Sequence, residues 1–162
     1  MWVRSFPRGS LRAEIGFGTD RAVDIKRYFT PEEASEQIPM LETTFSRLIQ
    51  LNAQLKPVYH SLDEAGFAPE NEHFEIAPDG APPAVVGDLS TLRALFDATR
   101  DTIQELADAG CVVKHIERGL VDWYAIKDGR EIMLCWKLGE KSVDYWHELD
   151  AGFNGRQPID SL

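Results

Sequence analysis

The spacing of apolar residues changes along the chain from a helical period to strict alternation. Over residues 38–62, one stripe recurs at alternating spacings of three and four, which is the pattern of an amphipathic helix. This first seam consists of Ile38, Leu41, Phe45, Leu48, Asn52, Leu55, Tyr59 and Leu62. A second seam consists of Leu89, Leu92, Phe96, Thr99, Ile103 and Leu106. The two seams predict two long helices.

The start of the first helical region is marked by local sequence signals. Thr30 is followed by Pro31 at a first-turn position and by Glu33 three residues after the cap, which together form a capping box. Pro39 predicts an interruption, because proline lacks an amide donor and clashes with the preceding turn. We therefore expect helical structure over residues 31–66, with a break just before Pro39.

The second long helix is expected over residues 88–109. Asp88 is its predicted N-cap, and Gly110 accepts the left-handed conformation in which helices commonly end. Residues 67–87 contain four prolines and are predicted to form a loop. Two seam-bearing helices joined by a loop most simply make an antiparallel hairpin.

Alternating residues over 111–136 predict three antiparallel strands. Asp128-Gly129 lies between two alternating runs, which is typical of a two-residue type I′ hairpin turn. The pairs set by this turn are Ala125 with Ile132, Trp123 with Leu134, and Val121 with Trp136. All six side chains are apolar and share one face, which we expect to pack on the helical hairpin. The opposite face carries Asp122, Tyr124 and Cys135.

The remaining segments complete the predicted architecture. Residues 141–149 are predicted to form a short C-terminal helix, and residues 1–27 a weakly structured N-terminal extension. The predicted fold class is α+β: an antiparallel hairpin of long helices packed on a small three-stranded antiparallel sheet, with a short C-terminal helix. Residues 28–158 are predicted to form a single domain.

Composition narrows the possible functions. The chain has 162 residues and a formal net charge of −10, which disfavours nucleic acid as a partner because such binding depends on Lys and Arg at the phosphates. There is no run of eighteen apolar residues, so no membrane span is predicted. Cys111 and Cys135 make neither a disulfide framework nor a CxxC unit. We expect reduced cysteines, a cytoplasmic location and no cofactor.

The most reactive group of side chains lies in Tyr145-Trp-His-Glu-Leu-Asp. If this segment is helical, Asp144 shares a face with His147 and with Glu148, and a carboxylate that orients an imidazole is the beginning of a general base. The candidate catalytic residues are His147, Glu148, Tyr145 and Asp122. They would serve a hydrolase or lyase, with or without a metal ion. The alternative is a surface helix in which Trp146 and Leu149 belong to the core.

A second candidate site is the turn that contains Arg156. Guanidinium groups match carboxylates and phosphates, so a small anionic ligand is one prediction for this turn. The candidate ligand-binding residues are Arg156, Gln157, Asp150 and Tyr124. The alternative is a salt bridge from Arg156 to Asp150 or Glu148. No HExxH or CxxC motif occurs, so no metal ligands are predicted.

Cys135 is expected beside Asp122 across the hairpin. A cysteine nucleophile needs a histidine base, and the nearest candidate, His115, is expected on the opposite face of the sheet. Cys135 is therefore interpreted as a buried small hydrophobe. Lys114 is expected to form a cross-strand ion pair with Asp122.

Several stretches of the chain resemble a known family. They are Tyr28-Phe-Thr-Pro-Glu-Glu-Ala, Gly119-Leu-Val-Asp, Asp128-Gly-Arg-Glu, Leu134-Cys-Trp-Lys-Leu-Gly-Glu and Tyr145-Trp-His-Glu-Leu-Asp-Ala-Gly-Phe-Asn-Gly-Arg-Gln-Pro. Together they are similar to the uncharacterised bacterial domain of unknown function family 2203, over about residues 28–158. Residues 67–87 depart from the family pattern, which is a more charged helical region there. The resemblance implies a cytoplasmic bacterial protein and supplies no catalytic residues.

These observations favour a non-enzymatic interaction or small-ligand-binding domain over an enzyme. A homodimer is predicted through the helical faces, because apolar stripes that find no partner within a chain promote self-association. The alternative function is the hydrolase or lyase whose site surrounds His147.

Overall fold

The computed structural model describes residues 26–161, which divide into two compact units. Among the described residues, the first unit comprises residues 26–45 and 106–161, and the second is Ser46–Glu105. The predicted N-terminal extension, residues 1–27, lies outside the described residues apart from Lys26 and Arg27. The fold is α+β, with helices and an antiparallel sheet, as the sequence predicts.

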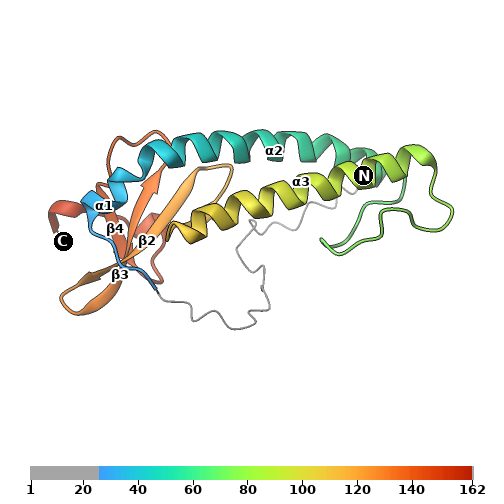
Figure 1. Cartoon of the computed structure of the whole chain (residues 1–162). Coiled ribbons are helices and arrows are strands. Elements are labelled where there is room, and N and C mark those ends of the chain that lie inside the picture. The colour runs from blue at the N-terminus through green and yellow to red at the C-terminus, as the bar shows by residue number, and fades with distance from the viewer. Residues whose placement is uncertain (1–25, 162) are drawn as a thin grey trace. The chain divides into compact units, whose positions relative to one another are not determined.

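The helices are α1 (Pro31–Glu36), α2 (Ile38–Glu64) and α3 (Pro83–Asp108), shown in Figure 1. The predicted capping box is present, because the Glu33 amide donates to Thr30 Oγ1 while the Thr30 amide donates to Glu33 Oε2 at 2.9 Å. The interruption between α1 and α2 falls at Gln37, as predicted.

The predicted start of α3 at Asp88 is wrong, because the helix begins at Pro83. Proline is tolerated in the first turn of a helix, where its missing amide would have no partner within the helix. Val85 in this first turn is buried. The proline-rich stretch therefore contains the end of a loop and the beginning of a helix.

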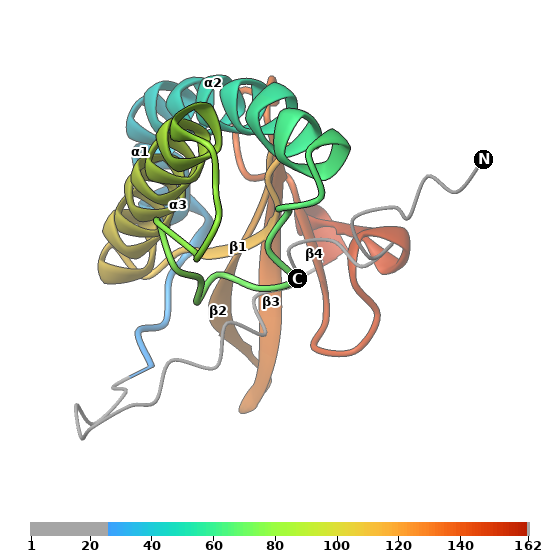
Figure 2. The same ribbon diagram turned by 90° about the vertical axis from the view of Figure 1, so that its right-hand side faces the viewer.

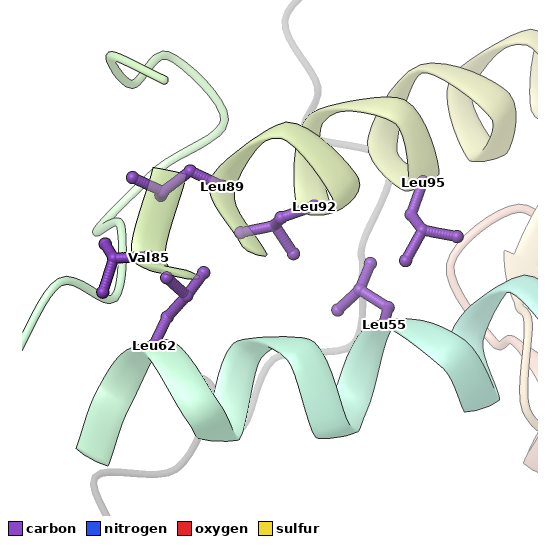
Figure 3. Close-up of a cluster of buried hydrophobic side chains, with 6 residues drawn as sticks. All are labelled: Leu55, Leu62, Val85, Leu89, Leu92 and Leu95. Atoms are coloured by element: carbon purple, nitrogen blue, oxygen red, sulfur yellow. The ribbon is translucent and has the colours of Figure 1, made fainter. Parts of the chain in front are cut away.

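Within the second unit, α2 and α3 run antiparallel around an apolar cluster (Figures 1 and 3). The cluster consists of Leu55 and Leu62 from α2 and Val85, Leu89, Leu92 and Leu95 from α3. The loop between α2 and α3 packs on this cluster through Phe67, Phe74 and other residues. Arg93 fixes the loop, because its guanidinium lies 4.2 Å from the Phe74 ring centroid and donates to the Phe74 carbonyl at 2.6 Å.

Within residues 26–161 the first unit contains a five-stranded antiparallel sheet in the order β1-β2-β3-β4-β5 (Figures 1 and 2). Its strands are β1 (Val112–His115), β2 (Leu120–Lys127), β3 (Arg130–Lys137), β4 (Tyr145–Glu148) and β5 (Gln157–Pro158). The pairing of β1 with β2 shifts register between Val113 and His115. The predicted count of three strands is therefore too low by two.

The β2–β3 hairpin has the register that the Asp128-Gly129 turn predicts. Both turn residues have positive φ, 50° and 76°, as a type I′ turn requires. The apolar face consists of Val121, Trp123, Ala125, Ile132, Leu134 and Trp136, all buried. Phe45 of α2 packs on this face, with its ring centroid 6.4 Å from that of Trp136.

Gln37, at the break between α1 and α2, forms a hydrogen bond with a residue of the apolar face through its side-chain amide. Its Oε1 atom accepts from the Trp123 indole and from the Cys111 thiol, each at 3.0 Å, and its amide nitrogen donates to the Ala109 carbonyl. The buried indole is therefore satisfied, as buried tryptophans usually are. Burial raises the pKa of Cys111 to about 12, so this thiol is unreactive near neutral pH.

The predicted helix over residues 141–149 is wrong, because the second half of this range is strand β4, which pairs with β3. β3 pairs with β2 along one side only, and its other side carries backbone groups that need partners. After Gly139, at φ 100°, the chain returns along that free side. Trp146 and His147 are buried as a result, and this tertiary gain outweighs the local helical preference.

None of the helices within residues 26–161 is long and apolar enough to cross a membrane.

Candidate functional site

The second face of the sheet contains a buried polar cluster of Asp122, Cys135 and His147. Each residue comes from a different one of three adjacent strands, and the cross-strand register places all three side chains on the same face. Their exposed fractions are 2%, 1% and 1%. One potential ligand atom from each residue lies within 4.8 Å of the other two. We call this group the polar cluster.

His147 uses both of its ring nitrogens. Nδ1 lies 2.7 Å from the Glu148 carbonyl oxygen, and Nε2 lies 3.2 Å from Asp122 Oδ2. A carbonyl oxygen only accepts, so Nδ1 carries a proton, and Nε2 donates to the carboxylate when the ring is an imidazolium. Burial lowers the pKa of His147, but the hydrogen bonds to Asp122 and to the Glu148 carbonyl raise it to a net value above the ordinary one.

Asp122 is only partly satisfied. Its Oδ2 atom contacts His147 and lies 3.7 Å from Lys114 Nζ, which confirms the predicted cross-strand ion pair even though Val112 is the residue directly opposite Asp122. Its Oδ1 atom is buried and has no hydrogen-bond partner. A buried polar atom without a partner costs about 1–3 kcal/mol, so this oxygen requires an explanation.

Cys135 lies against a carboxylate and an arginine. Burial, followed by the Asp122 carboxylate, raises the pKa of its thiol far above the ordinary range, although the nearby Arg156 opposes this shift. Arg156 also donates to the Cys135 carbonyl oxygen at 3.0 Å. The thiol is therefore protonated near neutral pH in the absence of another cation.

Arg156 forms a bidentate salt bridge with Glu140, at 2.6 and 2.8 Å, instead of with either predicted partner. Its guanidinium lies 4.1 Å from the Tyr145 ring centroid and 4.7 Å from that of Phe153. The side chain is only 11% exposed. With its charge neutralised by Glu140, Arg156 ties the C-terminal segment to this face of the sheet.

The other predicted site residues lie in several places. Glu148 forms an ion pair with Arg130 at 2.6 Å, near the surface. Tyr124, on β2, lies on the face of the polar cluster, and the Lys26 ammonium is 4.5 Å from its ring. Asp150 and Gln157 are exposed. The structure thus brings together His147 and Asp122 and places Tyr145 next to Arg156. It separates the side chains of Glu148, Asp150 and Gln157 from the cluster, although the Glu148 backbone carbonyl contacts His147.

Cys135 is the site residue whose role the sequence does not predict. The sequence places it beside Asp122 but gives it no histidine partner, because His115 is expected on the other face and His147 on a helix. The three-residue spacing of the apolar Val143 and Trp146 is that of a helix, so periodicity favours the wrong element here. The signal that could have identified this neighbour is the second side of β3, which needs a hydrogen-bonded partner. A further antiparallel strand on that side brings His147 next to Cys135.

The geometry does not resemble a cysteine–histidine nucleophile pair. A base must have a ring nitrogen free to take the thiol proton, but both nitrogens of His147 face other acceptors. The raised thiol pKa is also opposite to that of an activated nucleophile. The donor types sulfur, nitrogen and oxygen are instead those that bind transition metals in proteins.

Comparison with known proteins gives a family and nothing more specific. A family model described as "Uncharacterized conserved protein (DUF2203)" matches residues 27–159, which include the whole polar cluster. Neither a curated protein nor a solved structure matches the chain.

Proposed function

Because the chain belongs to the DUF2203 family of uncharacterised conserved proteins, we propose from its polar cluster that it binds a small ligand and does not catalyse hydrolysis or elimination. The observation that carries this proposal is the unpaired Asp122 Oδ1 atom, buried on an antiparallel sheet. A carboxylate oxygen accepts hydrogen bonds and attracts cations, so the ligand is a cation or a hydrogen-bond donor.

The small anionic ligand predicted around Arg156 has less support. Its guanidinium already pairs with both oxygens of Glu140, and an anion would have to displace that carboxylate. A buried arginine with a bidentate partner serves mainly to orient the segments that it joins.

The enzymatic alternative also has less support. Of its candidate residues, Glu148 pairs with Arg130 on the surface, and His147 has no ring nitrogen available to accept a proton from a substrate. General acid–base catalysis requires a group that reaches the substrate directly or through one water. His147 is 1% exposed, which is a poor position for that role.

Homodimerisation through the helical faces stays a prediction. Its premise was that the seam residues find no partner within one chain. Six of the eight positions in the first seam are at most 7% exposed in the structure, namely Ile38, Leu41, Phe45, Leu48, Leu55 and Leu62. Ile49, at 39% exposure, lies outside the seam. The seam itself therefore offers little apolar surface to a second chain.

A thermal-shift screen of the full chain tests the binding function. Wild-type protein is scanned against a panel of metal ions and small metabolites, beside Asp122→Asn and the matched control Asp144→Asn, whose carboxylate accepts from Ser142 at the surface. A bound ligand stabilises the folded state by mass action. We expect a cationic or donor ligand to raise the Tm of wild type and of the control, and to raise that of Asp122→Asn much less. Absence of any stabilising compound, or equal stabilisation of all three proteins, would contradict the proposal.

A further inference from the structure

We propose that the ligand is a divalent transition-metal ion of the zinc class, held by Asp122, Cys135 and His147. This inference rests on the proposed ligand-binding function and names the chemical class of the ligand. Among residues 26–161, these three side chains are the one group of at least three histidine, cysteine or acidic residues with donor atoms close enough to share a metal ion.

The donor set selects the class of metal. Zinc in proteins is bound by cysteine sulfur, histidine nitrogen and carboxylate oxygen, and the cluster supplies one of each. Thiolate is a soft ligand that favours zinc and similar metals, whereas magnesium and calcium take oxygen ligands almost exclusively. The cysteine thus disfavours the hard cations that an isolated aspartate would otherwise bind.

The spacing of the donors is close to that of a coordination sphere. With metal–ligand distances near 2.0–2.3 Å, two donors of a tetrahedral zinc lie about 3.3–3.8 Å apart. The three donor atoms here are all within 4.8 Å of one another, so they converge on a metal by movements of about 1 Å. Each of β2, β3 and β4 contributes one ligand, so each side chain can rotate toward the metal independently of the other two. The backbone of the sheet does not have to move.

His147 has the support that metal-bound histidines usually have. A ligating histidine commonly donates its other ring N–H to a carboxylate or a backbone carbonyl, which fixes the tautomer and the ring orientation. Nδ1 of His147 makes such a bond to the Glu148 carbonyl at 2.7 Å, and Nε2 faces Asp122. The nitrogen that would bind the metal is therefore already aimed into the cluster.

The unpaired oxygen of Asp122 fits the same role. Lys114 and His147 both contact Oδ2, and Oδ1 is buried without a donor. A metal ion at Oδ1 satisfies that oxygen while Lys114, whose side chain is 41% exposed, keeps its contact at the edge of the site. No ion pair in the cluster other than that between Asp122 and His147 has to break.

The charge balance favours a divalent ion. Metal binding through a carboxylate, a thiolate and a neutral imidazole places two negative charges around the ion. A divalent ion neutralises both charges, so the buried metal and its three ligands carry no net charge. A monovalent ion with the same three ligands would leave a net negative charge in the interior.

Cobalt and zinc binding to the full chain tests the inference. Protein freed of metal with a chelator is titrated with Co²⁺, and the near-ultraviolet absorption of a thiolate-to-cobalt charge transfer is followed. Zn²⁺ is then added as a competitor, with Mg²⁺ as the negative control. We expect a one-to-one complex with the charge-transfer band, which Zn²⁺ removes and Mg²⁺ leaves unchanged.

Matched variants locate the ligands. Cys135→Ser is compared with Cys111→Ser, the other buried cysteine, and His147→Asn with His60→Asn, an exposed histidine. We expect Cys135→Ser to lose the band and His147→Asn to weaken binding by more than the about 10- to 100-fold typical of residues that only orient a ligand. The Cys111 and His60 variants should bind like wild type. An unchanged band in Cys135→Ser overturns the inference.

A measurement on the wild-type protein alone tests the inference even if the variants fail to fold. Native mass spectrometry should show a mass increase that corresponds to one bound zinc ion. A wild-type protein that takes up no zinc refutes the metal site. If a metabolite nevertheless stabilises wild type in an Asp122-dependent manner, the binding function stands and only the metal inference fails. If neither zinc nor any metabolite acts, both fail.

Discussion

Alternate residues of β2, β3 and β4 form two faces that are similarly buried and differently stabilised. On one face Trp123, Leu134 and Trp136 are fully buried in apolar contacts. On the other, Asp122 and His147 are as deeply buried but are held by hydrogen bonds and opposite charges. Residues that are neighbours in sequence therefore belong to environments in which different physical terms dominate.

The comparison shows that the buried fraction of a side chain does not reveal which interaction stabilises it. On the apolar face, stability depends on volume and contact area, and a side chain of similar size is tolerated. On the polar face, stability depends on each group keeping its partner, because an unpaired buried charge is far more costly than a lost contact. Four substitutions, ordered from the largest expected effect to the smallest, test whether the two faces differ in this way.

Trp136→Ala should have the largest effect. It removes a fully buried ring that contacts Phe45, together with an indole N–H that donates to the Glu140 carbonyl at 2.9 Å. Large-to-small changes of buried aromatics cost about 3–5 kcal/mol. Urea unfolding followed by circular dichroism measures the free energy of unfolding. Trp136→Phe keeps most of the volume and should lose less than half as much; an equal loss would show that volume does not govern this face.

Asp122→Leu should be next, with a loss of about 3 kcal/mol, because it leaves His147 and its charge without a buried partner. The double variant Asp122→Leu with His147→Leu should recover part of that loss, since both polar partners are then gone. The same unfolding measurement gives the coupling energy of the pair. Additive losses would mean that partner satisfaction does not govern the polar face.

Arg156→Lys should lower the free energy of unfolding by about 1–2 kcal/mol, because an ammonium cannot form the bidentate contact with Glu140. Arg130→Lys is the control, since its contact with Glu148 joins side chains that are 53% and 35% exposed. That control should change stability by about 0–1 kcal/mol. Similar losses in the two variants would contradict the special role of the buried arginine.

Tyr28→Phe, at the exposed end of the polar face, should have the smallest effect, and this effect should appear in how stability depends on pH. The Tyr28 hydroxyl donates to Glu131 at 2.6 Å and Lys26 contacts the same carboxylate, and together they lower the pKa of Glu131. This lowered pKa contributes stability above the pKa of the unfolded chain, and the contribution is lost as pH falls through the folded pKa.

In Tyr28→Phe the pKa of Glu131 should return toward its ordinary value, which NMR titration of the Glu131 side chain measures. Lys26 remains as a partner in this variant, so a part of the shift should persist. An unaltered titration would show that the tyrosine hydroxyl is not the cause.

Sequence predicted the parts of the fold that local chemistry determines. Thr30 and Glu33 marked the start of α1, and Asp128-Gly129 set every pair of the β2–β3 hairpin. In both cases the interacting groups lie within a few residues of one another. The apolar face followed directly, because a fixed register assigns each side chain to one side of the sheet.

The error over residues 141–149 arose where a distant partner determines the structure. Residues 145–148 become a strand only because β3 has a free side, and no pattern within the segment encodes that partner. The candidate site inherited this error, since Cys135 and His147 meet only across that ladder. The sequence predicts Asp122 and His147 in one candidate site, with His147 on a helix against the polar face of the sheet. The structure brings the two side chains together from strands of the same sheet.

The two edges of the sheet have a consequence for the behaviour of the protein at high concentration. Unpaired strand edges are templates on which other chains add and aggregate. β5 has only two residues, and Pro158 has no amide hydrogen to offer a further strand. β1 carries the partly exposed Lys114 and a break in register. Short length, proline, charge and irregular pairing all oppose edge-to-edge growth, so the sheet is protected against amyloid-like polymerisation from both sides.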